Sequence, residues 1–162
     1  MKNYALMFLT LMTFWVLLNG SVDIQVLVVG AGVSLLVSLI FCAKCDVFSE
    51  INFTPKAIVA SVMFIITFLV ALIKANVSIT KRVLSPSLPL NPGIVKVKTK
   101  LKSKVGRMVL ANAITLTPGT FTIELDGEYM FIHWVNVETG DVEGSTKEIV
   151  SGFEKYLEVM YG

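Results

Sequence analysis

The sequence predicts a membrane α-helical region of about three N-terminal helices, followed by a small α+β domain. The first observation behind this prediction is composition. Hydrophobic residues make up 54% of the chain and the mean hydropathy is +0.74, more than a soluble domain of 162 residues needs for its core. The second is the distribution of charge, which is sparse from residue 4 to residue 73 and dense from Lys74 onward. We therefore expect the first part to lie in lipid and the second in water.

The change in composition divides the chain into three parts. We expect a transmembrane helical region over residues 1–76, a proline-rich linker over 77–93 and an α+β domain over 94–162. The formal net charge is only +2, and the lysines and arginines are not interleaved with aromatic residues that stack on bases. Both observations argue against nucleic acid as a partner.

Three apolar stretches without ionised side chains predict the membrane helices. They are residues 4–18, 24–43 and 57–73. A helix needs about 20 residues to cross the hydrocarbon layer, with a lower limit near 17, so the second stretch fits well, the third just fits and the first is short. We expect the first stretch to be retained, because no small-x-small cleavage site separates it from the second.

Turn and cap residues predict where these helices begin and end. Residues 19–23 are turn formers, which favour a tight hairpin between the first two helices. Thr54 is the expected N-cap of the third helix, and Pro55 suits its first position.

The basic residues predict the orientation. Lys74, Lys81 and Arg82 follow the third stretch closely, so the positive-inside rule places the C-terminal domain in the cytoplasm of a cell-membrane protein. Three spans then place the N-terminus outside. The lysines that favour the opposite arrangement are Lys2, Lys44 and Lys56. A first stretch that only dips into the membrane would also reverse the side of the N-terminus.

The expected spans contain hydroxyl groups but no ionisable groups. Ion and proton pathways in membranes are marked by ionisable residues, whereas serine and threonine usually bond to their own helix or to a neighbour. The hydroxyl residues are Thr10, Thr13, Ser34, Ser38, Ser61 and Thr67. We therefore expect that the chain does not carry ions by itself. Small residues over 30–38 favour packing against partner subunits, and a lipid-facing helix with incidental small residues is the alternative.

The two cysteines, Cys42 and Cys45, have the spacing of a Cys-x-x-Cys pair. This spacing suits redox exchange or half of a metal site. A structural zinc site needs four ligands, however, and the one histidine, His133, is distant in sequence. We therefore favour packing of two small apolar side chains, and we expect no metal and no cofactor.

Alternating residues from 94 to 102 predict a strand with one basic face. Val95, Val97, Thr99 and Leu101 point to one side. The residues on the other side are Lys96, Lys98, Lys100 and Lys102. This basic face is a candidate surface for anionic lipid headgroups or for an acidic partner, and a solvated face is the simpler alternative.

Periodicity and turn residues predict the rest of the domain. The expected elements are a helix over 104–115, strands over 121–125 and 129–137 joined at Asp126-Gly127, and a last helix that begins at Ser145 or Thr146 with Glu148 in its first turn. The predicted order is β-α-β-β-α. We expect a sheet of three strands with the two helices on one face.

The sequence predicts no catalytic site. His133 falls on a predicted strand, and no nucleophile with a paired acid can be assigned to it. Acidic residues cluster between 124 and 143, but without the spacing of a calcium loop. The sequence has no glycine-rich phosphate loop and no dinucleotide fingerprint. A non-enzymatic membrane subunit is therefore the prediction.

One stretch of the sequence resembles a known family. It reads Leu-Ala-Asn-Ala-Ile-Thr-Leu-Thr-Pro-Gly-Thr from Leu110 to Thr120, and it is followed by Phe-Thr-Ile and later by Ile-His-Trp. It resembles the E subunit (MnhE/MrpE) of the multisubunit Mrp-type sodium/proton antiporters, and the similarity covers nearly the whole chain. The motif residues, for which we expect a role in folding or assembly, are Leu110, Ala111, Asn112, Leu116, Thr117, Pro118, Gly119 and Thr120. Residues 100–107 are basic where the family often has an acidic residue.

The resemblance implies an accessory or assembly subunit of a large membrane complex that exchanges Na⁺ for H⁺, in which the large subunits carry the ions. Its partners would be the other subunits and membrane lipids. The alternative is the same subunit type within an archaeal membrane-bound hydrogenase or sulfur-reducing complex, where an Mrp-like module is joined to a redox module. A second alternative is a free-standing membrane-anchored module that recruits a soluble partner through its basic strand.

Overall fold

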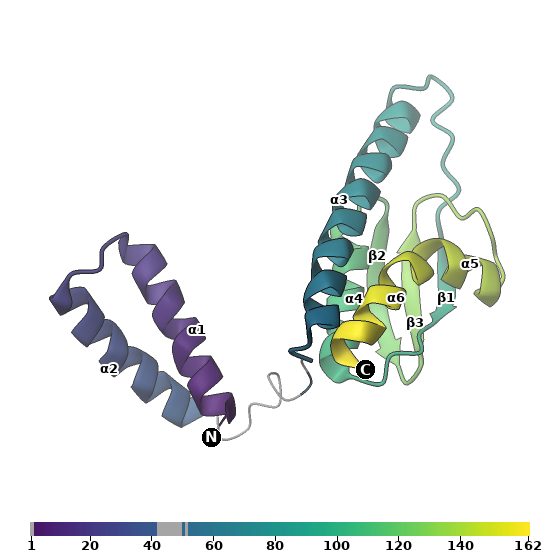
Figure 1. Cartoon of the computed structure of the whole chain (residues 1–162). Helices are drawn as coiled ribbons and strands as arrows, with labels where there is room; N and C mark the ends of the chain where they lie inside the picture. The colour runs from purple at the N-terminus through teal and green to yellow at the C-terminus, as the bar shows by residue number, and fades with distance from the viewer. Residues whose placement is uncertain (1, 42–49, 51) are drawn as a thin grey trace. The chain divides into compact units, whose positions relative to one another are not determined.

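The chain forms two compact units, residues Met1–Ile51 and Asn52–Gly162 (Figure 1). The computed structural model describes residues 2–41, 50 and 52–162. Cys42 and Cys45, for which packing was predicted, lie outside the described residues.

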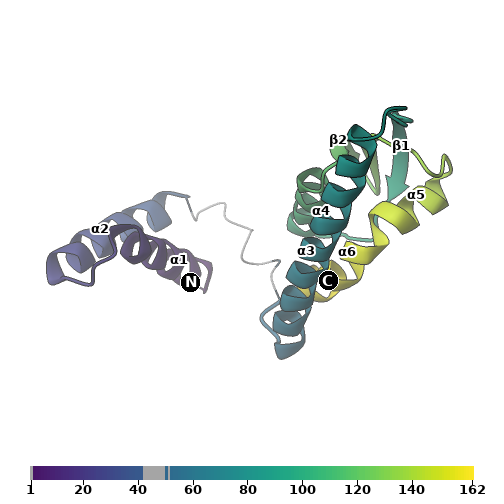
Figure 2. The same cartoon turned by 90° about the horizontal axis from the view of Figure 1, so that it is seen from above.

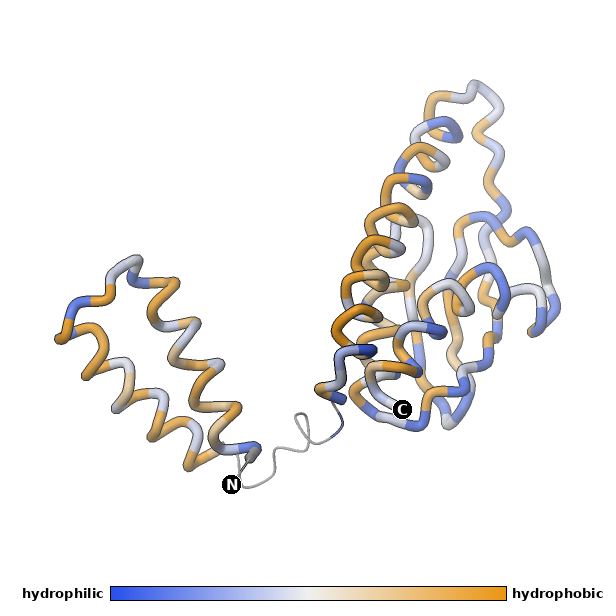
Figure 3. The backbone as a smooth tube through the Cα atoms, viewed as in Figure 1, coloured by the Kyte–Doolittle hydropathy of each residue, from blue (hydrophilic) through white to orange (hydrophobic). Residues whose placement is uncertain are grey.

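The elements follow one another in the order helix, helix, helix, strand, helix, strand, strand, helix, helix. They are α1 (Lys2–Asn19), α2 (Ile24–Phe41), α3 (Pro55–Val83), β1 (Gly93–Lys98), α4 (Lys104–Leu116), β2 (Thr120–Asp126), β3 (Tyr129–Trp134), α5 (Val142–Ile149) and α6 (Ser151–Tyr161). Among the described residues, α2 and α3 are long and apolar enough to cross a membrane, and α1 is a shorter apolar helix. Figure 3 shows hydrophobic residues along all three. The predicted fold class, N-terminal apolar helices with a small α+β domain, is confirmed.

The first unit is a helical hairpin of α1 and α2, as predicted. Its two helices meet where the indole of Trp15 lies against Gly30, and the Trp15 Nε1 donates to the carbonyl oxygen of Val26 at 2.9 Å. Gly30, Ser34 and Ser38 are the buried residues of α2, and their spacing of four puts them on one face. The small residues were expected to admit a partner subunit, but at Gly30 the space is taken by α1 of the same chain.

Hydroxyl groups on the apolar helices bond to their own backbone, as expected. The bonds are Thr10 to Leu6 O (2.8 Å), Thr13 to Leu9 O (2.8 Å), Ser38 to Leu35 O (2.9 Å) and Ser61 to Ala57 O (2.8 Å). Each of these hydroxyl protons is therefore used inside the helix that carries it.

The second unit is layered. Its antiparallel sheet has the strand order β1-β3-β2. Helices α4, α5 and α6 cover the face that carries Val97, Met130 and Ile132, all fully buried, and α3 lies outside α6 (Figure 2). The opposite face of the sheet carries exposed Ile94 and Phe121. The core therefore lies between the sheet and the helices, and α3 forms a third layer.

The first strand is shorter than predicted, but its buried side is as predicted. β1 ends at Lys98, yet the alternation continues past its end. Val95, Val97, Thr99 and Leu101 are between 0% and 5% exposed. The prediction of a buried side and a lysine side is confirmed.

The hairpin of β2 and β3 differs slightly from the prediction. Asp126 pairs with Tyr129, so the two loop residues are Gly127 and Glu128. Gly127 has a φ of +58°, which such short loops require. The ladder shifts register between Thr122 and Glu124, and β3 ends at Trp134 rather than at residue 137.

The prediction of one C-terminal helix was wrong. The chain forms α5 and α6, so the order of the domain is β-α-β-β-α-α. The N-cap of α5 is Asp141, whose side chain accepts from Gly144 N at 2.8 Å, and not Ser145 or Thr146. Ser145 lies inside the helix and is fully buried, with its hydroxyl bonded to Thr139 O at 2.9 Å. Asp141 is itself a strong N-cap residue, and it captures the helix start one turn earlier.

Helix α3 begins as predicted and ends later than predicted. The Thr54 hydroxyl accepts from Ala57 N at 3.2 Å, with Pro55 at the first helical position. The helix continues to Val83, so residues 77–83 of the predicted linker are helical. Helix α3 belongs to the same compact unit as the α+β residues. The predicted division of the chain at residues 76 and 93 into membrane region, linker and domain stays a prediction.

Candidate functional site

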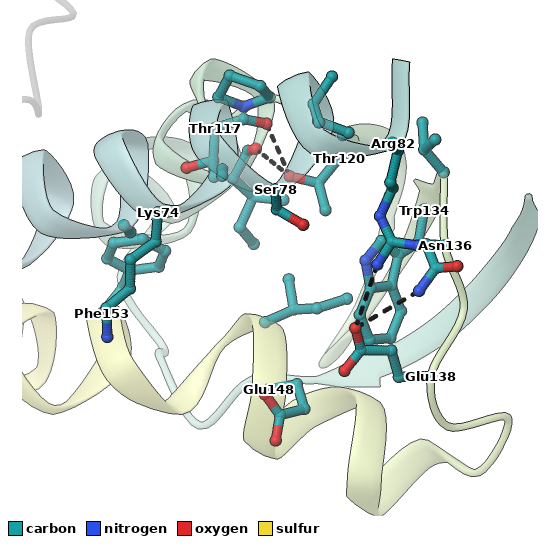
Figure 4. A pocket seen from close by; sticks show the side chains of 18 residues that line it. Lys74, Ser78, Arg82, Thr117, Thr120, Trp134, Asn136, Glu138, Glu148 and Phe153 are labelled. Atoms are coloured by element: carbon teal, nitrogen blue, oxygen red, sulfur yellow. Dashed lines mark hydrogen bonds and ion pairs between the residues drawn. The ribbon is translucent and has the colours of Figure 1, made fainter. Parts of the chain in front are cut away.

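A cleft of about 320 Å³ opens in the second unit between α3, the α4–β2 turn, the end of β3 and helices α5 and α6 (Figure 4). Its polar lining residues are Lys74, Ser78, Arg82, Thr117, Thr120, Asn136, Glu138 and Glu148. Trp134 and Phe153 supply apolar walls. The cleft is therefore lined by charges of both signs on an apolar base.

Arg82 organises the open end of the cleft. Its Nη2 lies 3.9 Å from Glu138 Oε1, and its Nη1 donates to Pro89 O at 3.2 Å. Asn136 Nδ2 donates to the same Glu138 oxygen at 3.4 Å. The Glu138 side chain is 57% exposed, so water screens the ion pair and its contribution to stability is about 1 kcal/mol or less. Arg82 mainly holds the end of α3 near the segment that follows β3.

The motif residues 117–120 form the turn at the base of the cleft. Thr120 N donates to Thr117 O at 3.3 Å, Pro118 occupies the second turn position, and Gly119 follows with a φ of +93°. These are the features of a type II turn. The Thr120 hydroxyl donates to Ile114 O at 2.7 Å, which satisfies a carbonyl at the end of α4. A Cβ on Gly119 would lie 3.2 Å from Ile79 Cδ1, so the turn packs closely against α3.

The other motif residues lie on α4. Leu110 and Ala111 are 0% and 8% exposed and belong to the interior. Asn112 and Leu116 are exposed, the latter by 64%. The structure thus brings residues 117–120 to the cleft and leaves Asn112 and Leu116 on the surface. The role of the motif in assembly stays a prediction.

The four lysines of the predicted basic face are all exposed. Lys96 and Lys98 point from the open face of β1, and Lys100 and Lys102 follow in the loop to α4. Lys96 Nζ lies 3.8 Å from the ring centre of Tyr129, and Lys98 Nζ lies 3.3 Å from Glu128 Oε2. The basic face is therefore continuous with an aromatic strand.

His133 lies on the open face of the sheet, away from the cleft. Its cross-strand neighbours are Ile94 on β1 and Phe121 on β2. Neither neighbour can act as a nucleophile or as an acid. Among the residues that the structure describes, no group of three or more His, Cys, Asp or Glu side chains is placed to hold a metal ion.

A second, apolar groove of about 500 Å³ lies between α3 and α6. Its lining includes Lys56, Met63 and Tyr156. A hydrogen bond with Thr67 lowers the pKa of the Tyr156 hydroxyl, and Lys155 lowers it further. Burial has the opposite effect on Tyr161, whose pKa it raises. This groove shows that α3 and α6 also meet near the start of α3.

Sequence reasoning missed Glu154, a buried carboxylate on α6. The side chain is 7% exposed, and its Oε1 accepts from the Thr99 hydroxyl at 2.6 Å and from Lys100 N at 2.7 Å. It thus fixes the end of the basic strand to α6. In the sequence it is one glutamate on an amphipathic helix, and only the fold identifies it as buried.

A hairpin of apolar helices and a layered α+β unit with a long apolar helix on its outside are typical of a membrane protein with a small α+β domain. The model of the family MnhE, described as a Na⁺/H⁺ ion antiporter subunit, matches residues 8–160. The chain therefore belongs to the family of Na⁺/H⁺ antiporter E subunits, as the sequence motif predicted.

Relatives agree with this family. The chain is 37% identical over 112 residues to the Na⁺/H⁺ antiporter E subunit of Alkalihalophilus pseudofirmus, covering 68% of this chain and 70% of the relative. It is 32% identical over 161 residues to the Na⁺/H⁺ antiporter E1 subunit of Staphylococcus haemolyticus, covering 96% and 92%. A chain in the structure of the membrane-bound sulfane sulfur reductase, an archaeal respiratory membrane complex, is 42% identical with a TM-score of 0.86, covering 98% of this chain and 99% of that one.

Proposed function

We propose that the chain is an accessory or assembly subunit of a multisubunit Na⁺/H⁺ antiporter in the cell membrane, and that other subunits carry the ions. Its partners are those subunits and membrane lipids. Family membership supports the antiporter, because the relatives are named as antiporter subunits and not as enzymes. The accessory role follows from the chemistry of the apolar helices.

One observation carries this proposal: the hairpin helices offer nothing that could pass an ion. Residues 3–19 and 24–41 contain no ionisable side chain except Tyr4, and the hydroxyls of Thr10 and Thr13 donate to their own helix. Transfer of Na⁺ or H⁺ through hydrocarbon needs carboxylates, histidines or rings of carbonyl oxygens. Transport therefore belongs to neighbouring chains.

Reconstitution tests the division of labour. The purified chain in sealed vesicles should produce no Na⁺-dependent proton flux, whereas the whole complex should. Cells that lack the chain should lose assembled complex, seen as loss of the large subunits from native gels. Na⁺-dependent proton flux by the isolated chain would disprove the accessory role.

A redox complex is the second candidate host. Its supporting observation is the 42% identity over 98% of the chain to a chain of the sulfane sulfur reductase. Purification from mild detergent followed by mass spectrometry separates the two hosts. An antiporter yields only transport subunits, whereas a sulfur-reducing complex or hydrogenase also yields iron–sulfur subunits.

We also propose that the chain is multi-pass and that its C-terminal unit lies in the cytoplasm. The support is the run of basic residues after α3 and in the α+β unit. A reporter that is active only in the cytoplasm should be active when it is fused after Gly162. A reporter that is active only after export should be inactive at the same position. Activity of an export-dependent reporter at that position would reverse the orientation.

A further inference from the structure

We propose that α3 does not cross the bilayer but lies in the membrane–water interface, with its outer apolar face against lipid acyl chains. The inference concerns an interaction surface and its partner, a lipid bilayer. It rests on the membrane location of the chain and is independent of which complex the chain joins.

The α+β unit contacts α3 from one end of the helix to the other. Near the start, Asn52 N donates to Met160 O at 2.9 Å. In the middle, the rings of Phe64 and Phe153 meet edge to face with centres 6.0 Å apart. Near the end, Ile79 packs on the turn at Gly119. The contact therefore follows a helix of 29 residues, about 43 Å at 1.5 Å per residue.

This packing is incompatible with a membrane-crossing α3. Helix α6 runs beside α3 (Figure 1), and its Lys155 and Glu158 are exposed. If α3 crossed the bilayer, α6 and the strands would enter the hydrocarbon layer with it. Each charged side chain at that depth costs about 2.5–3.5 kcal/mol on insertion scales. The unit carries charges throughout residues 94–162, so the summed cost excludes this arrangement.

The face of α3 that points away from the unit is apolar along most of the helix. Ala57 and Ala60 are buried against the unit, at 3% and 6% exposure. The exposed residues on the other side are Ile58, Val59, Val62, Ile65, Ile66, Leu69, Val70, Ile73 and Val77, each between 46% and 64% exposed. So large a continuous apolar surface needs a cover. An interfacial helix buries such a face about 5–10 Å into the headgroup and acyl boundary.

Lysines flank this apolar face along the length of the helix. Lys56 and Lys74 are about five turns apart and Lys81 follows about two turns later, so all three lie on the same flank at 3.6 residues per turn. Lys56 borders the groove towards α6 and Lys74 borders the cleft, and both are exposed, so their flexible stems let the ammonium groups extend from these rims to headgroup phosphates. This charge arrangement fits the bilayer interface better than the apolar helices of a partner subunit.

An interfacial α3 also removes the conflict among the basic residues. Only α1 and α2 then cross the bilayer, and everything except the turn between them lies on one side. That turn, residues 19–23, carries Asp23 and no lysine or arginine, so all 14 basic residues fall on the same side. Three spans would instead put Lys44 and Lys56 on the opposite side from Lys74 and Lys81, against the positive-inside rule.

Depth measurements on the full chain test the inference. Single cysteines replace Val59, Ile66 and Ile73 one at a time in a Cys42→Ser, Cys45→Ser background. Each is spin-labelled in vesicles of phosphatidylethanolamine and phosphatidylglycerol, and the ratio of oxygen to nickel-chelate accessibility gives its depth. The three positions are seven residues apart, which is about 10 Å along the axis. We expect the three depths to agree within a few ångströms, at about 5–10 Å below the phosphates.

Two outcomes would overturn the inference. A helix that crosses the bilayer gives depths that change by about 10 Å from one position to the next. A face covered by another protein or by a second copy gives labels that neither oxygen nor the chelate can reach. As a second readout, a tag placed before Met1 should stay on the same side of sealed vesicles as a tag after Gly162, whereas three spans separate them. None of these results depends on whether the chain carries ions, so failure here is distinguishable from failure of the accessory role.

Discussion

Gly119 sets the backbone of the turn that holds α3 against the end of the sheet. Its φ of +93° is one that side chains rarely adopt, and an added Cβ would meet Ile79 Cδ1 at 3.2 Å. We expect Gly119→Ala to lower the free energy of unfolding of the second unit by about 2 kcal/mol, from strain and crowding together. Urea unfolding followed by Trp134 emission in a Trp15→Phe background measures it.

Gly127 supplies the matched control for this substitution. It also has a positive φ, +58°, but nothing lies within 4 Å of the position of an added Cβ. Gly127→Ala should therefore cost only the strain, about 1 kcal/mol. Equal losses for the two variants would mean that the contact with α3 contributes nothing.

Glu154 is the buried acceptor at the end of the basic strand. Both of its bonds, from the Thr99 hydroxyl and from Lys100 N, go to the same oxygen, Oε1. A glutamine keeps a carbonyl oxygen at that position, so Glu154→Gln should cost only about 1 kcal/mol of unfolding free energy. Glu154→Leu leaves two donors unsatisfied and should cost about 3 kcal/mol. The same urea titration measures the unfolding free energy of both variants. A leucine variant more stable than the glutamine variant would contradict the role of Glu154 as a buried acceptor.

At the scale of elements, the close approach of α1 and α2 depends on Gly30. A Cβ there would lie 2.7 Å from Trp15 Nε1, whereas nothing lies within 4 Å at Gly32. We expect Gly30→Ala to displace the indole, break its bond to Val26 and shift Trp15 emission in a Trp134→Phe background. Gly32→Ala should leave the emission unchanged. A shift in both variants would point to a general effect on α2.

The sequence predicted correctly those features that depend only on residues close together in the chain. The cap at Thr54, the buried side of the strand at Val95 and Val97 and the glycine turn at Gly127 all follow from contacts within a few positions. Competition between two good caps decided the helix start at Asp141, and pattern alone could not rank them. The turn at residues 117–120 also has a local cause, because a Thr-Pro-Gly-Thr sequence suits few conformations, but its place beside a cleft was not predicted.

Long-range packing could not be predicted from the sequence. Phe64 packs on Phe153 of α6 and Ala57 is buried, while Val59 and Ile66 on the same helix are exposed. All four residues are apolar, so hydropathy assigns them alike, and the stretch was predicted to be a membrane span. For the same reason the cleft beside Arg82 and the burial of Glu154 appear only once α3, α6 and the sheet are assembled.

The basic strand face and α3 lie on different sides of the second unit. Lys96 and Lys98 lie on the sheet face opposite α4, α5 and α6, and α3 is the layer outside those helices. If α3 lies on the bilayer, these lysines point away from it and suit an acidic partner better than lipid. The double change Lys96→Glu and Lys98→Glu should therefore weaken co-purification with partner subunits and leave the depth of a spin label at Ile66 unchanged. A change in that depth would instead support contact of the basic face with lipid.

At the scale of the whole molecule, the core of the second unit is built, among the residues that the structure describes, from that unit alone. All members of the hydrophobic cluster, including the packed residues Phe64 and Phe68 of α3, fall within residues 52–162. We expect a fragment of these residues to fold without the hairpin and to show protected amides at Val97, Met130 and Ile132 in hydrogen exchange. Loss of protection in the fragment would mean that the hairpin is needed for the fold.

Binding of this fragment to vesicles then tests whether α3 is the surface that meets the bilayer. Two isoleucines of nearly equal exposure are each replaced by lysine for this comparison. Ile73 lies on the outer face of α3 and is 64% exposed, and Ile94 lies on the open face of the sheet and is 65% exposed. Ile73→Lys removes an apolar side chain from the lipid and should weaken binding to vesicles containing phosphatidylglycerol roughly tenfold, about 1.4 kcal/mol. Ile94→Lys adds the same charge on the far side of the sheet and should leave binding unchanged or slightly tighter. Sedimentation with vesicles measures both, with hydrogen exchange as the control for folding. Equal weakening by the two substitutions, with the fold intact, would show that α3 is not the surface that meets the bilayer.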